Sequence, residues 1–180
     1  MKEVITCDSI ILEESKRKDE LLNQISDWCG YKTMKLLYRG SRDGSTIKIF
    51  HEKCDNQGPT ICLYKNEKGY IFGGFAPISW TDKGGDHSSP GSFIFTLTNI
   101  YGIKPTKFPC SDKKVVYHNI EYGPTFDEDI CIYSDFGKVA CYSAFPCKYK
   151  DILGKGNSIF TNNKSSDLNI KEIEVFKLVN

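Results

Sequence analysis

Apolar residues recur at helical spacing near the start of the chain, three or four positions apart. They are Leu21, Leu22, Ile25 and Trp28. The residues before them, from Glu13 to Glu20, are mostly charged with both signs and suit a solvated helix face. Gly30 follows directly and is a residue type that ends helices. The pattern therefore predicts one helix over about residues 10–28.

The rest of the chain is dominated by short runs of β-branched, aromatic and other apolar residues, which indicate strands. These runs are Met34–Tyr38, Thr60–Tyr64, Tyr70–Phe75, Phe93–Leu97, Val115–His118, Ile130–Tyr133 and Ile170–Leu178. Asn66 to Gly69 separates two of them and predicts a hairpin with Gly69 at a positive φ. Ser45–Cys54 differs, since Ile47 and Phe50 lie three apart behind a polar cap, and it predicts a short helix.

The last run alternates imperfectly between apolar and charged residues. Glu172 and Glu174 interrupt it, so we expect a strand whose one face is partly solvated. Two polar stretches, Thr81–Gly91 and Lys150–Asp167, are expected to be exposed loops. The predicted fold is β-rich α+β: two antiparallel sheets packed as a β-sandwich, flanked by one longer N-terminal helix and short helices.

Composition narrows the class of protein. The chain has 180 residues, which suits one domain over residues 1–180. Lys plus Arg number 24 against 23 for Asp plus Glu, so the net charge of +1 gives no basis for nucleic-acid binding. No run reaches the roughly 18 apolar residues of a membrane span, and the start does not resemble a signal peptide. We expect a cytoplasmic monomer without membrane insertion.

The chain has eight cysteines, and no two of them have C-x-x-C spacing. A cytoplasmic location favours free thiols over disulfides. Cys62 and Cys131 lie between apolar neighbours and are expected to pack as small hydrophobic residues. Structural zinc needs four ligands, and a second pair like His51 and Cys54 does not occur, so neither a metal nor another cofactor is predicted.

A thiol nucleophile would need a base placed by the fold. Cys54 with His118 stays open as such a pair, although packing is the usual role of isolated cysteines. Phosphate-binding loops and the G-x-S-x-G elbow are absent from the sequence. The residues therefore favour a non-enzymatic protein.

Several blocks of the chain, taken in order, resemble the TLDc domain family. They are Leu36–Gly44 (LLYRGSRDG), Phe50–Thr60 (FHEKCDNQGPT), Gly69–Gly74 (GYIFGG), Ile78–Trp80 (ISW), Ser92–Leu97 (SFIFTL), Gly123–Phe126 (GPTF) and Lys171–Phe176 (KEIEVF). The similarity runs from about Ile11 to Leu178. Departures occur at Ser45, where an aromatic residue is common, and at Asp127–Asp129, where a glycine pair usually leads into Asp.

The resemblance implies a β-sandwich edged by helices and a domain that acts by binding. It further implies a link to oxidation resistance under oxidative stress and to binding or regulating the vacuolar proton-pumping ATPase, whose subunits become the expected partners. We expect a protein-interaction surface on exposed loops. Its candidate residues are Arg42, Asp43, His51, Glu52, Asp127, Glu128 and Asp129.

The alternative function is a thiol-based peroxide sensor or scavenger, which needs an exposed thiol of low pKa. Cys54 is the first candidate because it lies near Lys53 and His51. Cys147 is the second, because Lys148 follows it.

Overall fold

The computed structural model describes residues 6–133, 135 and 141–180. Its main feature is a six-stranded sheet in which all neighbouring strands are antiparallel. In spatial order the strands are β1 (Thr33–Arg39), β8 (Ile170–Val179), β2 (Thr60–Asn66), β3 (Ile71–Ala76), β5 (Phe93–Thr96) and β6 (Thr106–Pro109). A smaller sheet pairs β4 (Gly85–Ser88) with β7 (Lys114–His118). The β-rich α+β class is thus confirmed.

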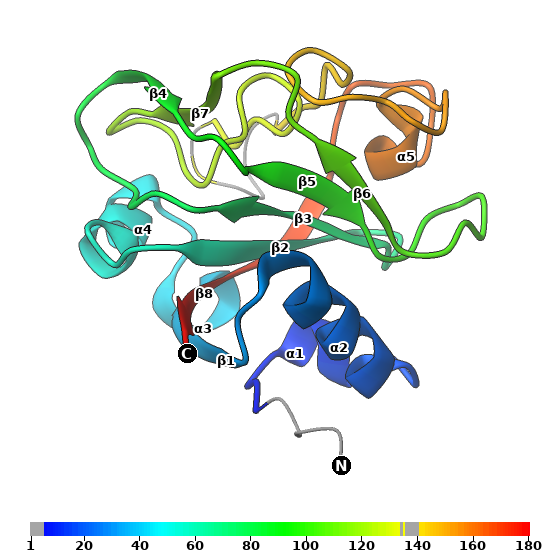
Figure 1. The fold of residues 1–180 in the computed structure, drawn as a ribbon, viewed down its shortest axis with the longest axis horizontal. Helices are drawn as coiled ribbons and strands as arrows, with labels where there is room; N and C mark the ends of the chain where they lie inside the picture. Colours follow the sequence, from blue (N-terminus) through cyan, green and yellow to red (C-terminus); the bar gives the residue numbers. More distant parts are fainter. Residues whose placement is uncertain (1–5, 134, 136–140) are drawn as a thin grey trace.

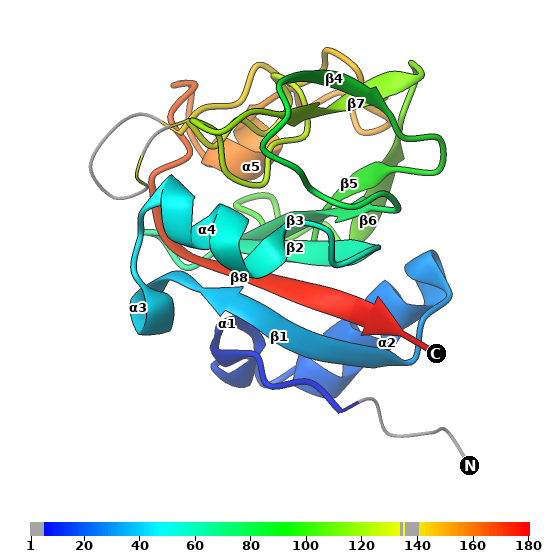
Figure 2. The ribbon, with the colours of Figure 1, turned by 90° about the vertical axis from the view of Figure 1, so that its left-hand side faces the viewer.

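Two layers cover the large sheet on opposite faces (Figures 1 and 2). The helices α1 (Ile10–Glu13) and α2 (Lys18–Cys29) lie against one face. The β4–β7 ribbon and the irregular chain around it lie over the other, together with α5 (Ser158–Thr161). At one end of the sheet lie α3 (Gly40–Asp43) and α4 (Ile47–Cys54) (Figure 2).

Each layer has its own hydrophobic core. On the helix side, Leu12, Leu21 and Ile25 pack against Ile61 and Phe95 of the sheet. The other core is larger and rich in aromatic residues. Its largest buried members include Trp80, Tyr64, Phe72, Phe108, Phe126, Tyr149 and Phe160. The sheet is therefore buried on both faces over much of its area.

The single N-terminal helix predicted over residues 10–28 is wrong, because the chain is interrupted between Glu13 and Lys18. Leu12 and Leu21 are both fully buried. In an uninterrupted helix they would lie about two and a half turns apart, on opposite faces. The break lets both side chains face the sheet. The predicted stop is confirmed, since Gly30 caps α2 in the left-handed conformation.

The strand predictions agree with the structure except over Ile130–Tyr133, where only isolated bridges form. The hairpin after β2 is confirmed, with Gly69 at a φ of 86°. The two stretches expected to be loops contain β4 and α5, which are only four residues each. Elements this short carry little periodic signal, since the repeat is hardly completed.

The partly solvated face predicted for the last strand is confirmed only toward its ends, where Lys171 is exposed and Lys177 is half-buried. β8 lies between β1 and β2 in the large sheet, and Glu174 is fully buried within it. Gly73 and Gly74 lie inside β3, not at its end. A Cβ on Gly74 would lie 2.5 Å from the ring of Phe126, so glycine is required there by the packing of the aromatic core.

Candidate interaction site

The β4–β7 ribbon carries two different surfaces, because successive side chains of a strand point to opposite faces. Asp86 pairs in register with Tyr117, and both line a cavity. Their neighbours His87 and His118 stack on one another with ring centroids 4.1 Å apart. His118 also packs against the buried Trp80. The ribbon thus turns histidines toward the core and an acid–tyrosine pair toward the cavity.

The cavity has a volume of about 390 Å³ and is formed by side chains from four separate segments. It is lined by Asp86, Tyr117, Tyr122, Thr125, Asp127, Glu128, Cys131, Tyr142, Cys147 and Lys148. Tyr117 and Tyr122 meet edge to face at 4.8 Å between ring centroids. Two regions singled out in the sequence, the acidic loop and Cys147, therefore meet at one place.

Asp129 holds these two regions together. Its carboxylate is fully buried and accepts hydrogen bonds from the backbone N–H groups of Cys147 at 2.7 Å and Lys148 at 2.8 Å. The backbone N–H of Ala144 also donates to the carbonyl of Glu128 at 2.8 Å. The prediction of Asp129 as a surface contact is therefore wrong, since it builds the cavity from inside.

Asp127 is the carboxylate of the cavity whose conformation and burial are described most fully by its contacts. It has a φ of 51°, a conformation that Asp and Asn tolerate better than most residues. Its Oδ1 accepts from the backbone N–H of Glu128 at 2.8 Å. Partial burial, reinforced by the nearby charge of Asp86, raises the pKa of the Asp127 carboxyl. The ionised form of Asp127 is therefore disfavoured in this cavity, and the charge of Lys148 offsets the effect only in part.

Among the described lining residues, Lys148 is the one that carries a positive charge, against three carboxylates. Its ammonium group already pairs with Asp112 at 3.0 Å. Among the described residues, no ion pair involves Asp86, Asp127 or Glu128. The cavity thus combines tyrosine rings with an excess of negative charge.

His51 has a structural role beside this site. Its Nδ1 lies 2.9 Å from Asp55, and its Nε2 lies 2.9 Å from the carbonyl of Asn119 and 3.0 Å from that of Tyr122. These contacts join α4 to the segment that supplies Tyr122. Its side chain is only 9% exposed, so His51 positions the cavity wall and offers little surface to a partner.

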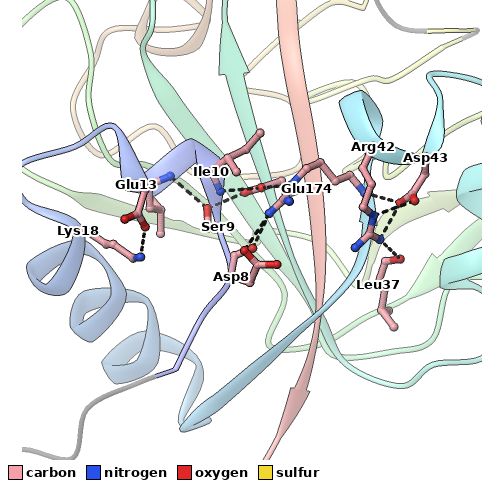
Figure 3. A network of polar contacts seen from close by, with 11 residues as sticks. Asp8, Ser9, Ile10, Glu13, Lys18, Leu37, Arg42, Asp43 and Glu174 are labelled. Carbon is pink, nitrogen blue, oxygen red and sulfur yellow. Dashed lines mark hydrogen bonds and ion pairs between the residues drawn. The ribbon is translucent and has the colours of Figure 1, made fainter.

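Arg42 and Asp43 belong to a second polar cluster at the end of β1 (Figure 3). The guanidinium of Arg42 donates to both oxygens of Asp43 at 2.8 Å. This pairing lowers the pKa of Asp43 to about 2. Glu52 is exposed on α4 and lies 3.8 Å from Lys48. None of these three residues lines the cavity.

Glu174 is the centre of that second cluster (Figure 3). Its carboxylate accepts from Arg39 Nε at 2.8 Å, from Ser9 Oγ at 2.6 Å and from the backbone N–H of Ile10 at 3.0 Å. Arg39 lies directly opposite Glu174 in the β1–β8 register. Two charges from adjacent strands thus pair across the sheet, and the pair is buried.

The thiols do not have the properties that a peroxide sensor requires. Cys54 is fully buried, and burial raises its thiol pKa far above the usual range. Cys147 is exposed, yet partial desolvation of its thiol and the nearby carboxylates of Asp129 and Glu128 raise its pKa as well. A thiolate was expected at either residue because a lysine is adjacent. Each lysine does lower the thiol pKa, but burial and the nearby carboxylates raise it by more.

The Cys54–His118 pair does not form either. Both ring nitrogens of His118 are buried without a hydrogen-bond partner among the described residues. Desolvation, with a smaller contribution from His87, lowers the pKa of His118 to about 3. Over residues 6–133, 135 and 141–180, the structure contains no group of three His, Cys, Asp or Glu side chains that would hold a metal ion. Nor does any helix in those ranges have the length and apolar character needed to cross a membrane.

The six-stranded sheet with its helical and irregular layers, and an acidic cavity built by loops, define a β-rich α+β domain with a loop-borne candidate binding site. The TLDc domain family model matches residues 6–179, so the chain belongs to the TLDc domain family. It is also similar to the MTOR-associated protein MEAK7 of Danio rerio, with 33% identity over 63 residues. That match covers 35% of this chain and 14% of the zebrafish protein.

The cavity contained signals that sequence reasoning missed. Asp86, Tyr122 and Tyr142 were not singled out, since each lies in a stretch without periodicity, and Tyr117 was interpreted only as part of the predicted strand Val115–His118. Asp86 reaches the site only because β4 pairs with β7, and β4 lies in a Gly- and Ser-rich stretch. The acidic run Asp127–Asp129 was the available sign of this site.

Proposed function

We propose that this chain is a non-enzymatic protein-interaction domain of the TLDc family, spanning residues 1–180 as one unit. The observation that carries the proposal is the acidic, tyrosine-lined cavity built by loops over a sheet that is packed on both faces. A rigid scaffold that presents loops is a common arrangement for binding. The zebrafish relative is itself named for an association with another protein.

The partner we propose is the vacuolar proton-pumping ATPase, in the cytoplasm and with this domain as a monomer. Binding there would alter the assembly or activity of the pump and thereby contribute to protection against oxidative stress. A ligand shifts an equilibrium between two states only by binding one of them more tightly. The domain would therefore prefer either the assembled or the separated form of the pump.

The test is direct binding between the purified domain and purified subunits of the proton pump, immobilised one at a time. The expected result is retention of the native domain by at least one subunit. The heat-unfolded domain and an unrelated protein of similar size and net charge are the controls. Equal retention of all three on every subunit would contradict the proposal.

The peroxide-sensor alternative gains no support from the geometry. An efficient sensor needs a thiolate near neutral pH, and both candidate thiols have raised pKa values.

A further inference from the structure

We propose that the acidic cavity binds an arginine side chain presented by a protein partner. This inference rests on the proposed function and deepens it by giving the chemistry of the contact. The anchor is Asp127, with Asp86 and Glu128 adding negative charge, and the rings of Tyr117 and Tyr122 form an aromatic wall.

The charge distribution favours a cationic ligand. Among the described residues, three carboxylates face the cavity against one lysine, Lys148, which is ion-paired with Asp112 and offsets the charges of Asp127 and Asp86 only in part. Asp127 and Asp86 lie close enough to disturb one another electrostatically. A positive group placed between them relieves this repulsion, since opposite charges favour the ionised carboxylate.

The aromatic wall favours arginine over lysine. A guanidinium is planar, stacks on aromatic faces and forms two parallel hydrogen bonds with one carboxylate, whereas an ammonium is a compact and more strongly hydrated charge. A cation over a tyrosine ring gains further attraction from the ring electrons. Tyr117 and Tyr122 contribute such rings to the lining of the same cavity as Asp127.

The cavity is preformed, which lowers the ordering required for binding. The buried carboxylate of Asp129 connects the acidic loop to Cys147 and Lys148 by two hydrogen bonds, and His51 contacts the carbonyl of Tyr122. The volume of about 390 Å³ lies at the lower end of the range of pockets that take small ligands or single anchoring side chains. A metal ion fits less well, because these residues offer no cluster that would hold one.

The test is a titration of the isotope-labelled 180-residue chain, followed by backbone NMR, with the peptide acetyl-Gly-Arg-Ser-Arg-Gly-amide. The expected result is saturable shifts at Thr125, Asp127, Glu128 and Cys147. The variant Asp127→Asn should weaken binding by about tenfold, the loss that follows when one charge-assisted contact is removed. Asparagine accepts the same φ and keeps the oxygen that bonds to Glu128, so the loop is retained.

Matched controls give each outcome a meaning. Asp27→Asn removes one exposed charge from α2, on the opposite face of the sheet, and should leave binding unchanged. The lysine analogue of the peptide should bind severalfold more weakly, and the glutamate analogue should not bind. Equal binding of the lysine analogue would overturn the preference for arginine.

The inference is overturned if the glutamate peptide produces the same shifts, if Asp127→Asn binds as tightly as the parent chain, or if calcium chloride at matched ionic strength reproduces the shifts. Failure here is distinct from failure of the proposed function. If a pump subunit retained Asp127→Asn as strongly as the parent chain, the proposed function would stand. Only the cavity would then be rejected as the contact surface.

Discussion

Two carboxylates, Glu174 and Asp127, show how differently this domain treats negative charge. Glu174 is fully buried and has three donors, one of them the guanidinium of Arg39. Asp127 is half-buried, accepts a hydrogen bond from the backbone N–H of Glu128 and forms no ion pair with the described residues. The charge of Glu174 is satisfied within the fold, whereas Asp127 has no ion-pair partner among the described residues, and we infer that its charge is available to a ligand. The predictions below test that distinction.

The largest effect is expected from neutralising Glu174. Glu174→Gln removes the buried counter-charge of Arg39 and leaves it only the longer contact with the exposed carboxylate of Asp8, and breaking a buried pair in this way costs about 3–5 kcal/mol. Urea unfolding measures the loss. The matched variant Asp127→Asn should change the free energy of unfolding by no more than about 0.5 kcal/mol, as surface substitutions usually do. Similar losses for the two variants would erase the distinction between the two sites.

The next effect connects the scaffold to the cavity. Gly74→Ala places a Cβ 2.5 Å from the ring of Phe126, the residue before Asp127. Overpacking of this kind costs about 1–3 kcal/mol, and displacement of Phe126 should also weaken binding of the arginine peptide. Gly84→Ala is the control, because its Cβ would have only an ordinary contact at 3.7 Å. Urea unfolding measures the loss of stability, and the NMR titration measures the affinity for the peptide. An unchanged affinity would show that the packing of Phe126 does not influence binding in the cavity.

A third prediction concerns acid. The pKa of His118 is about 3 in the folded protein and about 6.5 when unfolded. Between these values the unfolded chain binds a proton that the folded chain does not, so stability falls as pH falls. One such group contributes up to about 1.4 kcal/mol per pH unit. Urea unfolding from pH 7 to pH 4 should show this slope.

His118→Phe is the variant that isolates this contribution. Phenylalanine keeps an aromatic ring against Trp80 and His87 and removes the titrating group. The acid-dependent loss of stability should become shallower than in the parent chain, while the carboxylates continue to titrate in both. An identical slope in the two proteins would assign the acid sensitivity to other groups.

The smallest effect is expected at Cys147. Cys147→Ser should leave unfolding and arginine-peptide binding unchanged, since the thiol lines the cavity without a charge. Mass spectrometry after mild peroxide should show Cys147 oxidised no faster than free glutathione, because its pKa is raised. Faster, selective oxidation of this residue would restore the sensor alternative.

The sequence predicted those parts of the fold that repeat a pattern several times. β2, β3 and β8 are long and apolar, and α4 begins at Ile47 as its spacing indicates. The break after Glu13 was not predicted, because it depends on where Leu12 and Leu21 meet the sheet. Burial of Glu174 was missed for the same reason: only the assembled sheet places Arg39 opposite it.

The candidate site was predicted only in outline. Asp127 and Glu128 were singled out by charge, and both line the cavity. Asp129 has the same side chain and a neighbouring position, yet it is buried and holds two backbone donors. No local pattern distinguishes these roles, since they depend on contacts with residues almost twenty positions away.

The position of β8 has a consequence for how the chain reaches this state. Residues 170–179 separate β1 from β2, so the sheet cannot close during synthesis until these residues have emerged from the ribosome. Pairing across some 140 residues is also intrinsically slow. Until then β1 and β2 expose unpaired backbone edges, which are templates for aggregation. Premature termination before residue 170 should therefore yield insoluble chains, and a nascent domain would depend on chaperones for most of its synthesis.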